Sequence, residues 1–191
     1  MIQSKSDYQY YIEEDRKYYF GKQKPNKWRE VFFPDLVWRF QKALRRYEYA
    51  NNVKHGIFGR ILTLFAYYKY RKLSIKLGFL IPKNVCGPGL SIAHYGPVLI
   101  HSSSKIGKNC RIHVGVSVSA SAGSSKGPIL GDNVYIGTGA IIFGDITIAN
   151  NVMIGANATV NKSVETENCV IAGTPARIVK ENVGLWHENR R

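Results

Sequence analysis

Aliphatic residues recur every six positions between residues 100 and 160. Eleven positions share this register. Ser124 is the one non-aliphatic residue among them, and the other ten are Ile100, Ile106, Ile112, Val118, Leu130, Ile136, Ile142, Ile148, Ile154 and Val160. A period of six differs from the 3.6 residues of a helical turn and from the two-residue alternation of a strand. It is typical of a solenoid whose short strands, joined by tight turns, each bury one residue. The pattern predicts a parallel β-helix with about eighteen residues in each three-sided coil.

A second set of small or β-branched residues follows four positions behind the first: Cys110, Val116, Val134, Ala140, Ile146, Val152, Ala158 and Val164. Between the two sets stand residues that tolerate positive φ, as tight turns require. These are Gly107, Gly131-Asp132-Asn133, Gly137, Gly144-Asp145, Asn150-Asn151 and Gly155-Ala156-Asn157. Residues 119–128 interrupt the repeat with small polar side chains, and we predict that they leave the coil as a mobile flap.

The chain before the repeat shows helical spacing instead. Residues 7–20 form a polar, tyrosine-rich candidate helix, and a break at residues 21–27 with Pro25 follows. Pro34, suited to a first helical position, opens a second helix with one apolar face: Leu36, Phe40, Leu44 and Tyr47. A third helix is predicted to end at Gly78 and carries a longer apolar stripe: Ile57, Ile61, Leu64, Phe65, Tyr68 and Ile75. These helices are too few for a large core of their own, so we expect them to pack on the β-helix or on a neighbouring subunit.

The charge and the aromatic content of the chain change near residue 80, where helical spacing gives way to the repeat. Residues 1–80 carry 17 Lys and Arg against 7 Asp and Glu, and the rest of the chain carries 10 against 6, so the net charge of +14 divides into +10 and +4. The first part also holds 19 of the 23 aromatic residues. We predict two domains, a helical one over residues 1–78 and a β-helix over residues 79–191.

The composition also limits the cellular setting. No apolar run reaches the roughly 18 residues of a membrane-spanning helix, and the acidic, tyrosine-rich start does not read as a signal peptide. Cys86, Cys110 and Cys169 are odd in number and lack metal-like spacing, which is typical of reduced thiols in the cytoplasm.

Two motifs border the repeat. Residues 87–98 read Gly-Pro-Gly-Leu-Ser-Ile-Ala-His-Tyr-Gly-Pro-Val, and residues 171–179 read Ile-Ala-Gly-Thr-Pro-Ala-Arg-Ile-Val. Here the chain resembles the hexapeptide-repeat acyltransferases, and among them the serine acetyltransferases. Residues 1–79 look more like the helical leaders of serine-acetyltransferase-like enzymes in bacterial surface-polysaccharide pathways. The resemblance implies a left-handed β-helix, a homotrimer, and acetyl-CoA bound along the seam between subunits. It leaves open whether the helices join two trimers into a hexamer.

His94 matches the catalytic histidine of this family. Acetyl transfer to a hydroxyl needs a base near the acceptor oxygen and donors near the developing oxyanion. A histidine suits the first role because its ordinary pKa is about 6.5. His113 lies about one coil further on, where it would contact the acceptor or cross the seam, although an ordinary turn residue fits the spacing equally. Tyr95 and Lys126 complete the expected acceptor site.

The remaining histidines favour no metal site. We interpret His101, at the following turn, as structural. The carbonic-anhydrase branch of this fold binds metal through ligands that converge across the seam, and nothing in the sequence indicates such convergence. We therefore expect no metal.

Small residues predict the place of acetyl-CoA. At a spacing of eighteen, two triplets should stack side by side: Gly137, Gly155 and Gly173, with Thr138, Ala156 and Thr174 next to them. Such a ladder leaves a shallow slot for the amide-bearing pantetheine arm, although tight turns alone also demand glycine. Lys162, Arg177 and Lys180 lie toward the same end and could donate charge-assisted hydrogen bonds to the CoA phosphates. Each fits a solvated surface side chain equally well.

The sequence differs from the serine acetyltransferases at positions that bind the acceptor. In true serine acetyltransferases an aspartate precedes the catalytic histidine and binds the serine amino group, and a second aspartate upstream orients the imidazole. Ala93 and Phe79 stand at these positions, and Gly127 aligns near the loop histidine that helps to hold serine. An ammonium group without its carboxylate loses its main means of recognition, whereas a neutral sugar hydroxyl needs none. Asp15, Asp35 or a backbone carbonyl are the candidates to orient His94.

We therefore predict an acetyl-CoA-dependent O-acetyltransferase that acts by direct transfer on a hydroxyl of a surface-polysaccharide sugar. The alternative is L-serine O-acetylation in cysteine biosynthesis. A catalytically silent scaffold is a further alternative, because the orienting aspartate is absent. The basic segment Lys69-Tyr70-Arg71-Lys72 beside an apolar helix face also raises the question of anionic partners. We expect no nucleic acid there, and peripheral contact with the inner face of the membrane fits the segment better.

Overall fold

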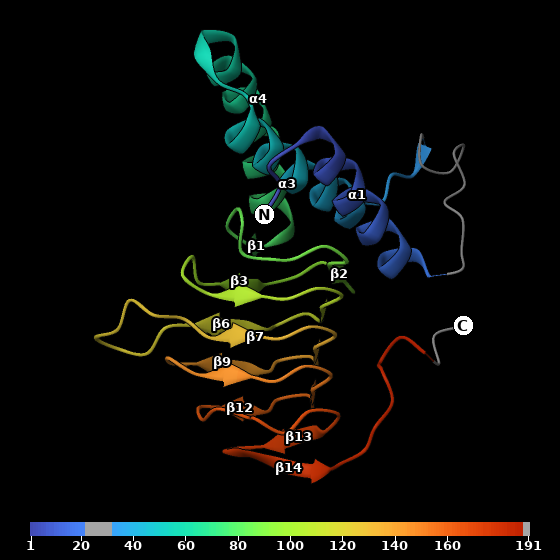
Figure 1. Ribbon diagram of the computed structural model, residues 1–191, viewed down its shortest axis with the longest axis vertical. Coiled ribbons are helices and arrows are strands. Elements are labelled where there is room, and N and C mark those ends of the chain that lie inside the picture. Colours follow the sequence, from blue (N-terminus) through green and yellow to red (C-terminus); the bar gives the residue numbers. More distant parts are fainter. Residues whose placement is uncertain (22–31, 189–191) are drawn as a thin grey trace.

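The computed structural model describes residues 1–21 and 32–188. Its described helices are α1 (Lys5–Phe20), α3 (Leu36–Val53) and α4 (Gly56–Leu77), and they stand at one end of a column of stacked coils (Figure 1). The predicted break after the first helix begins at Gly21, which caps α1, and its remaining residues, 22–27, lie outside the described residues. Among the described residues, no helix is both long enough and apolar enough to span a bilayer.

The helix ends have local causes. The Ser4 side chain accepts a hydrogen bond from the Asp7 amide at the start of α1. The Asp35 carboxylate accepts one from the Trp38 amide at the start of α3, so Asp35 is the cap. Pro34 therefore precedes the cap, and its predicted place at the first helical position is wrong. Gly78 ends α4 in the left-handed conformation at φ 76°, as a C-terminal cap glycine does.

The column consists of short strands in three sheets. They are β1 (Phe79–Leu80), β2 (Ser91–Ile92), β3 (Val98–Ile100), β4 (Lys105–Ile106), β5 (Arg111–Ile112), β6 (Ser117–Ser119), β7 (Ile129–Leu130), β8 (Tyr135–Ile136), β9 (Ile141–Phe143), β10 (Thr147–Ile148), β11 (Met153–Ile154), β12 (Thr159–Val160), β13 (Val170–Gly173) and β14 (Ala176–Lys180). The first sheet has the order β1-β3-β6-β9-β12, the second β10-β7-β4 and the third β14-β13-β11-β8-β5-β2. Neighbouring strands are parallel except β13 and β14. Each coil passes from the second sheet to the third and then to the first, which is the parallel β-helix that the six-residue period predicts.

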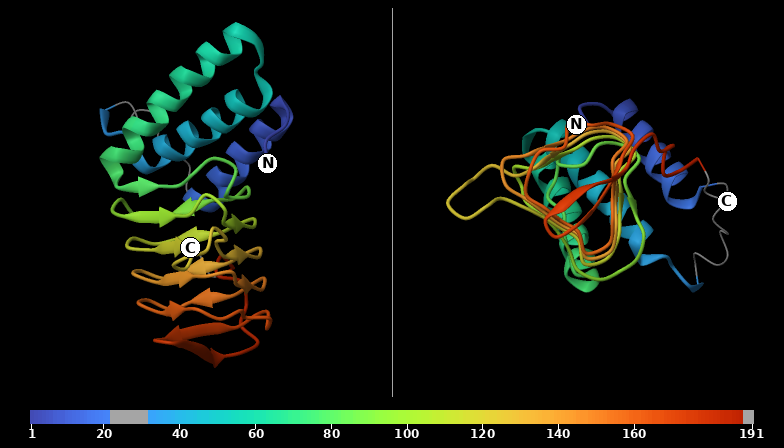
Figure 2. Two further views of the ribbon diagram at one scale, coloured as in Figure 1. Left: turned by 90° about the vertical axis from the view of Figure 1, so that its left-hand side faces the viewer. Right: turned by 90° about the horizontal axis from the view of Figure 1, so that it is seen from below.

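The ten aliphatic positions of the repeat are all buried, and they form the core of the column. Ser124 falls outside this core because residues 120–128, between β6 and β7, leave the column as a projecting loop (Figures 1 and 2). Ile106 pairs with Leu130 and Leu130 with Ile148, spacings of 24 and 18 residues. The loop adds six residues to one coil. Because six is the length of one repeat, the six-residue spacing of buried positions continues after the loop, although Ser124 itself lies outside the core.

The turns differ from the prediction in one respect. Of the predicted turn residues, Gly144, Asn133, Asn151 and Asn157 have positive φ, whereas Gly107, Gly131, Gly137 and Gly155 do not. Glycine is required for another reason. A Cβ on Gly137 would lie 2.7 Å from the Ala156 backbone nitrogen, so it is the close approach of successive coils that excludes a side chain there.

The helices and the first coil share one hydrophobic core. Phe40 of α3 packs edge-on against Phe79 of β1 with ring centroids 4.9 Å apart, and the Tyr70 hydroxyl of α4 donates to the Ile81 carbonyl at 2.7 Å. By contrast, the predicted apolar stripe of α4 faces away from the column; Ile57 is 77 % exposed. The expectation that the helices pack on the β-helix is thus confirmed for α3 and for the inner face of α4, whereas the apolar stripe of α4 takes no part in this contact. The division into two domains at residue 78 stays a prediction.

Candidate active site

His94 is the second residue after β2, at the turn that leads from the third sheet to the first. We call the stacked turns at this edge, residues 93–97, 113–116, 137–140 and 155–158, the His94 corner. His94 is exposed and His113 half-buried, and their rings lie edge to face with centroids 6.0 Å apart. Ile92 pairs with Ile112, so Ala93 rather than Tyr95 stands opposite His113. The structure thus brings the two histidines together. The spacing between paired residues of the first two coils is twenty instead of the predicted eighteen.

The two other residues predicted for the acceptor lie apart from this pair. Tyr95 is 76 % exposed at the turn itself. Lys126 belongs to the projecting loop, where its Nζ lies 3.0 Å from the Asp145 carboxylate with both side chains exposed. The loop leaves from the turns between the first and second sheets, which we call the loop corner. Within one chain, the structure therefore does not bring Lys126 to His94 (Figure 1).

His101 stands at the loop corner and has a structural environment. Its Nδ1 hydrogen bonds with the Ser103 hydroxyl at 2.8 Å. The Ser103 hydroxyl oxygen accepts a hydrogen bond from the Gly127 amide at 2.7 Å. His101 thus helps to hold the end of the projecting loop, in agreement with its structural interpretation.

An aromatic cluster that the sequence does not indicate lies beside the two histidines. After β14 the chain returns along the coils toward α1 (Figure 1). This places the Trp186 indole nitrogen 3.0 Å from the Asn109 carbonyl, to which it donates. Tyr135 of β8 lies between Trp186 and His113, with ring centroids 6.5 and 5.0 Å away, and His187 packs edge-on against Tyr18 of α1 at 5.0 Å. Burial lowers the pKa of His187. The C-terminal segment has no repeat pattern, so no signal in the sequence pointed to this contact.

Neither carboxylate proposed to orient His94 does so. Asp15 is fully buried and accepts hydrogen bonds from Arg45 at 2.8 and 3.2 Å and from the Leu90 amide at 2.8 Å. Asp35 caps α3 and accepts from the Tyr19 hydroxyl at 2.8 Å. Phe79, at the family's second aspartate position, is only 3 % exposed and belongs to the core. Of the three candidates, the backbone carbonyl is left.

Arg45 connects the helices to the segment that leads to His94. Its guanidinium is completely buried and binds Asp15 at 2.8 Å and Glu48 at 3.0 Å. It also donates to the carbonyls of Cys86 at 2.8 Å and Gly87 at 2.6 Å. Burial alone would lower the pKa of Arg45, but Asp15 and Glu48 raise it well above its ordinary value, so the side chain stays charged. The network fixes residues 86–90 just before β2.

The small residues predicted to hold acetyl-CoA do gather at the His94 corner, with one correction. Gly137 stacks on Gly155, because β8 pairs with β11 in register. Ile154 pairs with Ile171, a spacing of seventeen residues, so Ala172 lies over Gly155. The predicted stacking of Gly173 on Gly155 is wrong, because the last coil is one residue short.

Because the last coil is one residue short, different residues line the predicted acetyl-CoA slot, but they are still small and exposed. Thr138 is followed by Ala156 and then by Gly173, and all three are exposed. Thr174 moves next to Asn157, whose carbonyl accepts a 3.4 Å hydrogen bond from the Thr174 hydroxyl. A column of small, exposed residues therefore runs down the coils below His94 and His113.

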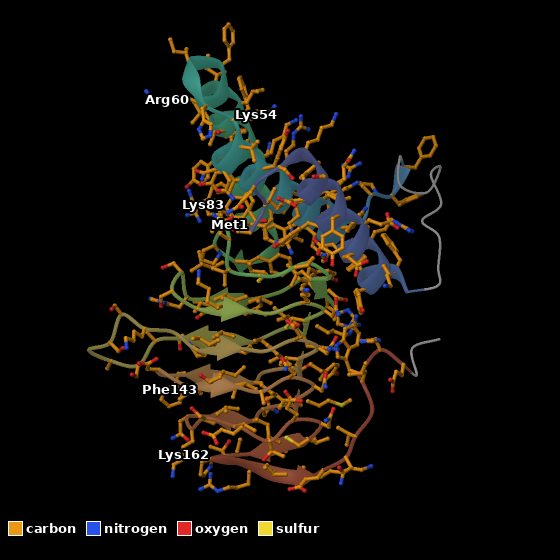
Figure 3. The ribbon with its side chains drawn as sticks, viewed as in Figure 1. Met1, Lys54, Arg60, Lys83, Phe143 and Lys162 are labelled. Carbon is orange, nitrogen blue, oxygen red and sulfur yellow. The ribbon has the colours of Figure 1, made fainter. Side chains whose placement is uncertain are left out.

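The predicted basic residues cluster at the last coil. Lys162 and Arg177 line one groove of about 440 Å³, and Lys180 ends β14 nearby. Lys162 follows β12 at the loop corner, whereas the small-residue column is at the His94 corner. Figure 3 shows Lys162 near the last coil, on the side of the projecting loop. The prediction that these bases lie toward one end agrees with the structure, but Lys162 and the column occupy different edges of the chain.

The cysteines offer no nucleophile. All three are buried as free thiols. Burial raises the pKa of Cys86 to about 12 and that of Cys110 well above its ordinary value, so both stay protonated and unreactive. Within residues 1–21 and 32–188, no group of three or more His, Cys, Asp or Glu side chains could hold a metal ion.

Comparisons with known proteins agree with this arrangement. Residues 127–162 match the family model "Bacterial transferase hexapeptide (six repeats)", and a search of curated proteins gives no match. Serine acetyltransferase from Brucella abortus strain S19 superposes with a TM-score of 0.72 at 23 % identity, over 94 % of this chain and 71 % of that chain. The chain has the hexapeptide-repeat fold of the serine acetyltransferases. The expected left-handed β-helix with an N-terminal helical region is thereby confirmed.

Two further structures show the same likeness. The Brucella abortus enzyme in complex with coenzyme A superposes with a TM-score of 0.71 at 25 % identity, over 95 % of this chain and 70 % of that chain. Serine acetyltransferase from Neisseria gonorrhoeae gives a TM-score of 0.69 at 21 % identity, over 95 % and 70 %. In each comparison nearly all of this chain is matched, the helical region included.

Proposed function

We propose that this protein is an acetyl-CoA-dependent O-acetyltransferase whose acceptor is a neutral hydroxyl, as on a surface-polysaccharide sugar. The observation that carries the proposal is the His94 corner. An exposed histidine with a second imidazole 6.0 Å away stands at one end of a column of small, exposed residues. A base and a narrow site for an extended thioester thus lie on the same edge of the fold.

The chemistry needs only groups at this edge. His94 takes the proton of the acceptor hydroxyl, whose oxygen attacks the thioester carbonyl of acetyl-CoA. The C–O bond forms, the C–S bond breaks, and His94 returns the proton to the leaving thiolate. Since the cysteines are buried and protonated, the acetyl group passes directly to the acceptor without a covalent acyl-enzyme.

The site for acetyl-CoA combines the slot with the basic end of the column. The pantetheine arm would follow Thr138, Ala156 and Gly173, with Gly137, Gly155 and Thr174 beside them, because small side chains allow close approach. Arg177 and Lys180 of the last coil would meet the phosphates, and Lys162, which lies at the loop corner, would reach them from a neighbouring copy. The likeness to a Brucella enzyme solved with coenzyme A supports this assignment.

A homotrimer would complete the site. His94 is exposed in the single chain, whereas a working base needs a partly enclosed environment. The first sheet also presents apolar side chains outward: Leu80, Leu99 and Ile141 are 45 %, 42 % and 44 % exposed. A neighbouring copy packed there would cover these side chains and place its projecting loop, with Lys126, against the His94 corner. The three buried thiols fit a reducing cytoplasm.

The acceptor proposal rests on two missing carboxylates. Ala93 precedes His94, and the buried Phe79 occupies the position of the orienting aspartate. Without these groups an ammonium-bearing acceptor such as L-serine lacks a counter-charge. L-Serine O-acetylation stays the alternative, because the matched solved structures are serine acetyltransferases.

The acceptor is tested by thiol release from acetyl-CoA with matched acceptors. We expect neutral sugars of a saccharide panel to support release at least about tenfold faster than L-serine, a factor that corresponds to roughly 1.4 kcal/mol. Ala93→Asp adds a carboxylate next to His94 and should shift this ratio toward L-serine. L-Serine as the best acceptor of the unaltered protein would overturn the neutral-acceptor proposal and support the alternative.

A further inference from the structure

Helix α4 exposes an apolar stripe on the face opposite to its packing face. Ala66, Tyr70, Ser74 and Leu77 are buried against the rest of the protein. The outer stripe, half a turn away, consists of Ile57, Ile61, Leu64, Tyr68 and Ile75, which are 77 %, 46 %, 66 %, 62 % and 68 % exposed. Phe58 and Phe65 extend it near the start of the helix, at 83 % and 64 %. So large an exposed apolar surface indicates a binding partner.

Charges of one sign border the outer stripe. Residues Gly56–Leu77 contain five basic residues and no Asp or Glu. At 100° per residue, Arg60 and Arg71 fall on one side of the stripe, and Lys69, Lys72 and Lys76 fall on the other. The helix therefore has a hydrophobic face flanked by Arg60 near its start and by four cations over residues 69–76.

A groove between α3 and α4 extends the positive charge. Its volume is about 640 Å³, and its lining contains no acidic residue but six basic ones: Arg39, Lys42, Arg46, Lys69, Lys72 and Lys76. The free end of α4 stands clear of the coils, and Figure 3 shows Lys54 and Arg60 there. Nothing in the column shields this end from an approaching surface (Figures 1 and 2).

We propose that α4 docks the protein on an anionic lipid bilayer. The outer stripe would enter the boundary between headgroups and acyl chains, while the flanking Lys and Arg side chains meet lipid phosphates. Charge complementarity selects this occupant. A second copy would bring together two helices whose charged side chains are all positive, and these would repel each other. A nucleic acid would pair with the cations but leave the apolar stripe in water.

Docking through α4 also has a consequence for the active site. β2 and His94 belong to the coil next to the helices, whereas Lys162 and β14 lie at the far end. A bilayer contact at α4 would hold the His94 corner nearer to the lipid surface than the rest of the column. An acceptor carried on a membrane lipid would meet the enzyme at this end.

Co-sedimentation of the full chain with vesicles tests the proposal. We expect pelleting with phosphatidylcholine vesicles that contain phosphatidylglycerol, weak pelleting with phosphatidylcholine alone, and release at high salt. Lys69→Gln/Lys72→Gln/Lys76→Gln and Ile57→Ser/Ile61→Ser/Phe65→Ser should each lower the partition coefficient by about tenfold or more. These side chains lie outside the core, so both variants should fold, which circular dichroism checks.

A matched control removes three lysines elsewhere. Lys5→Gln/Lys105→Gln/Lys108→Gln changes the net charge equally and should keep most of the binding. No pelleting of the unaltered protein at low salt, or an equal loss in the control, would overturn the proposal. So would a fall in oligomeric mass, measured by light scattering, for the stripe variant with unchanged pelleting, because a second copy would then be the occupant. Thiol release with a soluble acceptor is measured separately, so failure of docking is distinguishable from failure of the acetyltransferase proposal.

Discussion

Replacing Arg45 by methionine is expected to lower the free energy of unfolding by about 3–5 kcal/mol. Arg45 is completely buried and is the cation for both Asp15 and Glu48. Methionine fills similar space but leaves two carboxylates inside the protein without a counter-charge. It also removes the donors to the Cys86 and Gly87 carbonyls. Urea unfolding followed by circular dichroism measures the loss.

The neighbouring residue is the control. Arg46 is exposed, so Arg46→Met should change the free energy of unfolding by no more than about 0.5 kcal/mol. The deficit of Arg45→Met should shrink as the pH falls. A buried carboxylate without its cation has a raised pKa in the folded state, and its protonation relieves the penalty. Equal stability of the two variants at neutral pH would mean that the buried network does not fix the helices to the first coil.

Replacing His94 by glutamine is expected to lower the rate of acetyl transfer by roughly 10²–10⁴ while acetyl-CoA still binds. Glutamine keeps the size and a hydrogen-bonding group, but it cannot take the proton of the acceptor hydroxyl. The small-residue column that would hold the pantetheine arm lies on coils below His94 and is untouched. Thiol release measures the rate, and titration calorimetry measures binding.

His55→Gln is the matched control for this variant. His55 is exposed at the start of α4 and its side chain makes no capping hydrogen bond, so its replacement should leave the rate within a few-fold of that of the unaltered protein. Unchanged turnover of the His94 variant would show that His94 is not the general base. A loss of the same size in both variants would point to a general disturbance of the fold.

Much of the fold follows from the sequence, because a solenoid repeats one local rule. Each buried aliphatic residue of the six-residue period marks a strand, and the period continues after residues 120–128 leave the column. Counting alone fails where the local rule changes. The last coil is one residue short, so Ala172 replaces Gly173 above Gly155. The first coil is longer, so Ala93 stands opposite His113.

The candidate site was predictable only in part. The motif around His94 and the spacing to His113 put both residues near one corner of the fold. The surroundings depend on contacts between distant segments: Asp15 with Arg45, Trp186 with Asn109, and Tyr18 with His187. These contacts do not repeat from coil to coil, and the two residues of each pair lie 30 to 169 positions apart in the sequence, so no periodic pattern indicates them. Similarly, helical spacing identified the apolar stripe of α4, but only the structure shows that it faces away from the protein.

We propose that the His94 corner transfers an acetyl group from acetyl-CoA to a hydroxyl. Mass spectrometry of a saccharide acceptor after incubation with acetyl-CoA tests it most directly. We expect a base-labile acetyl ester on the acceptor with the unaltered protein and at most a trace with His94→Gln. Failure of the protein to bind acetyl-CoA, or equal ester formation by the two proteins, would contradict it.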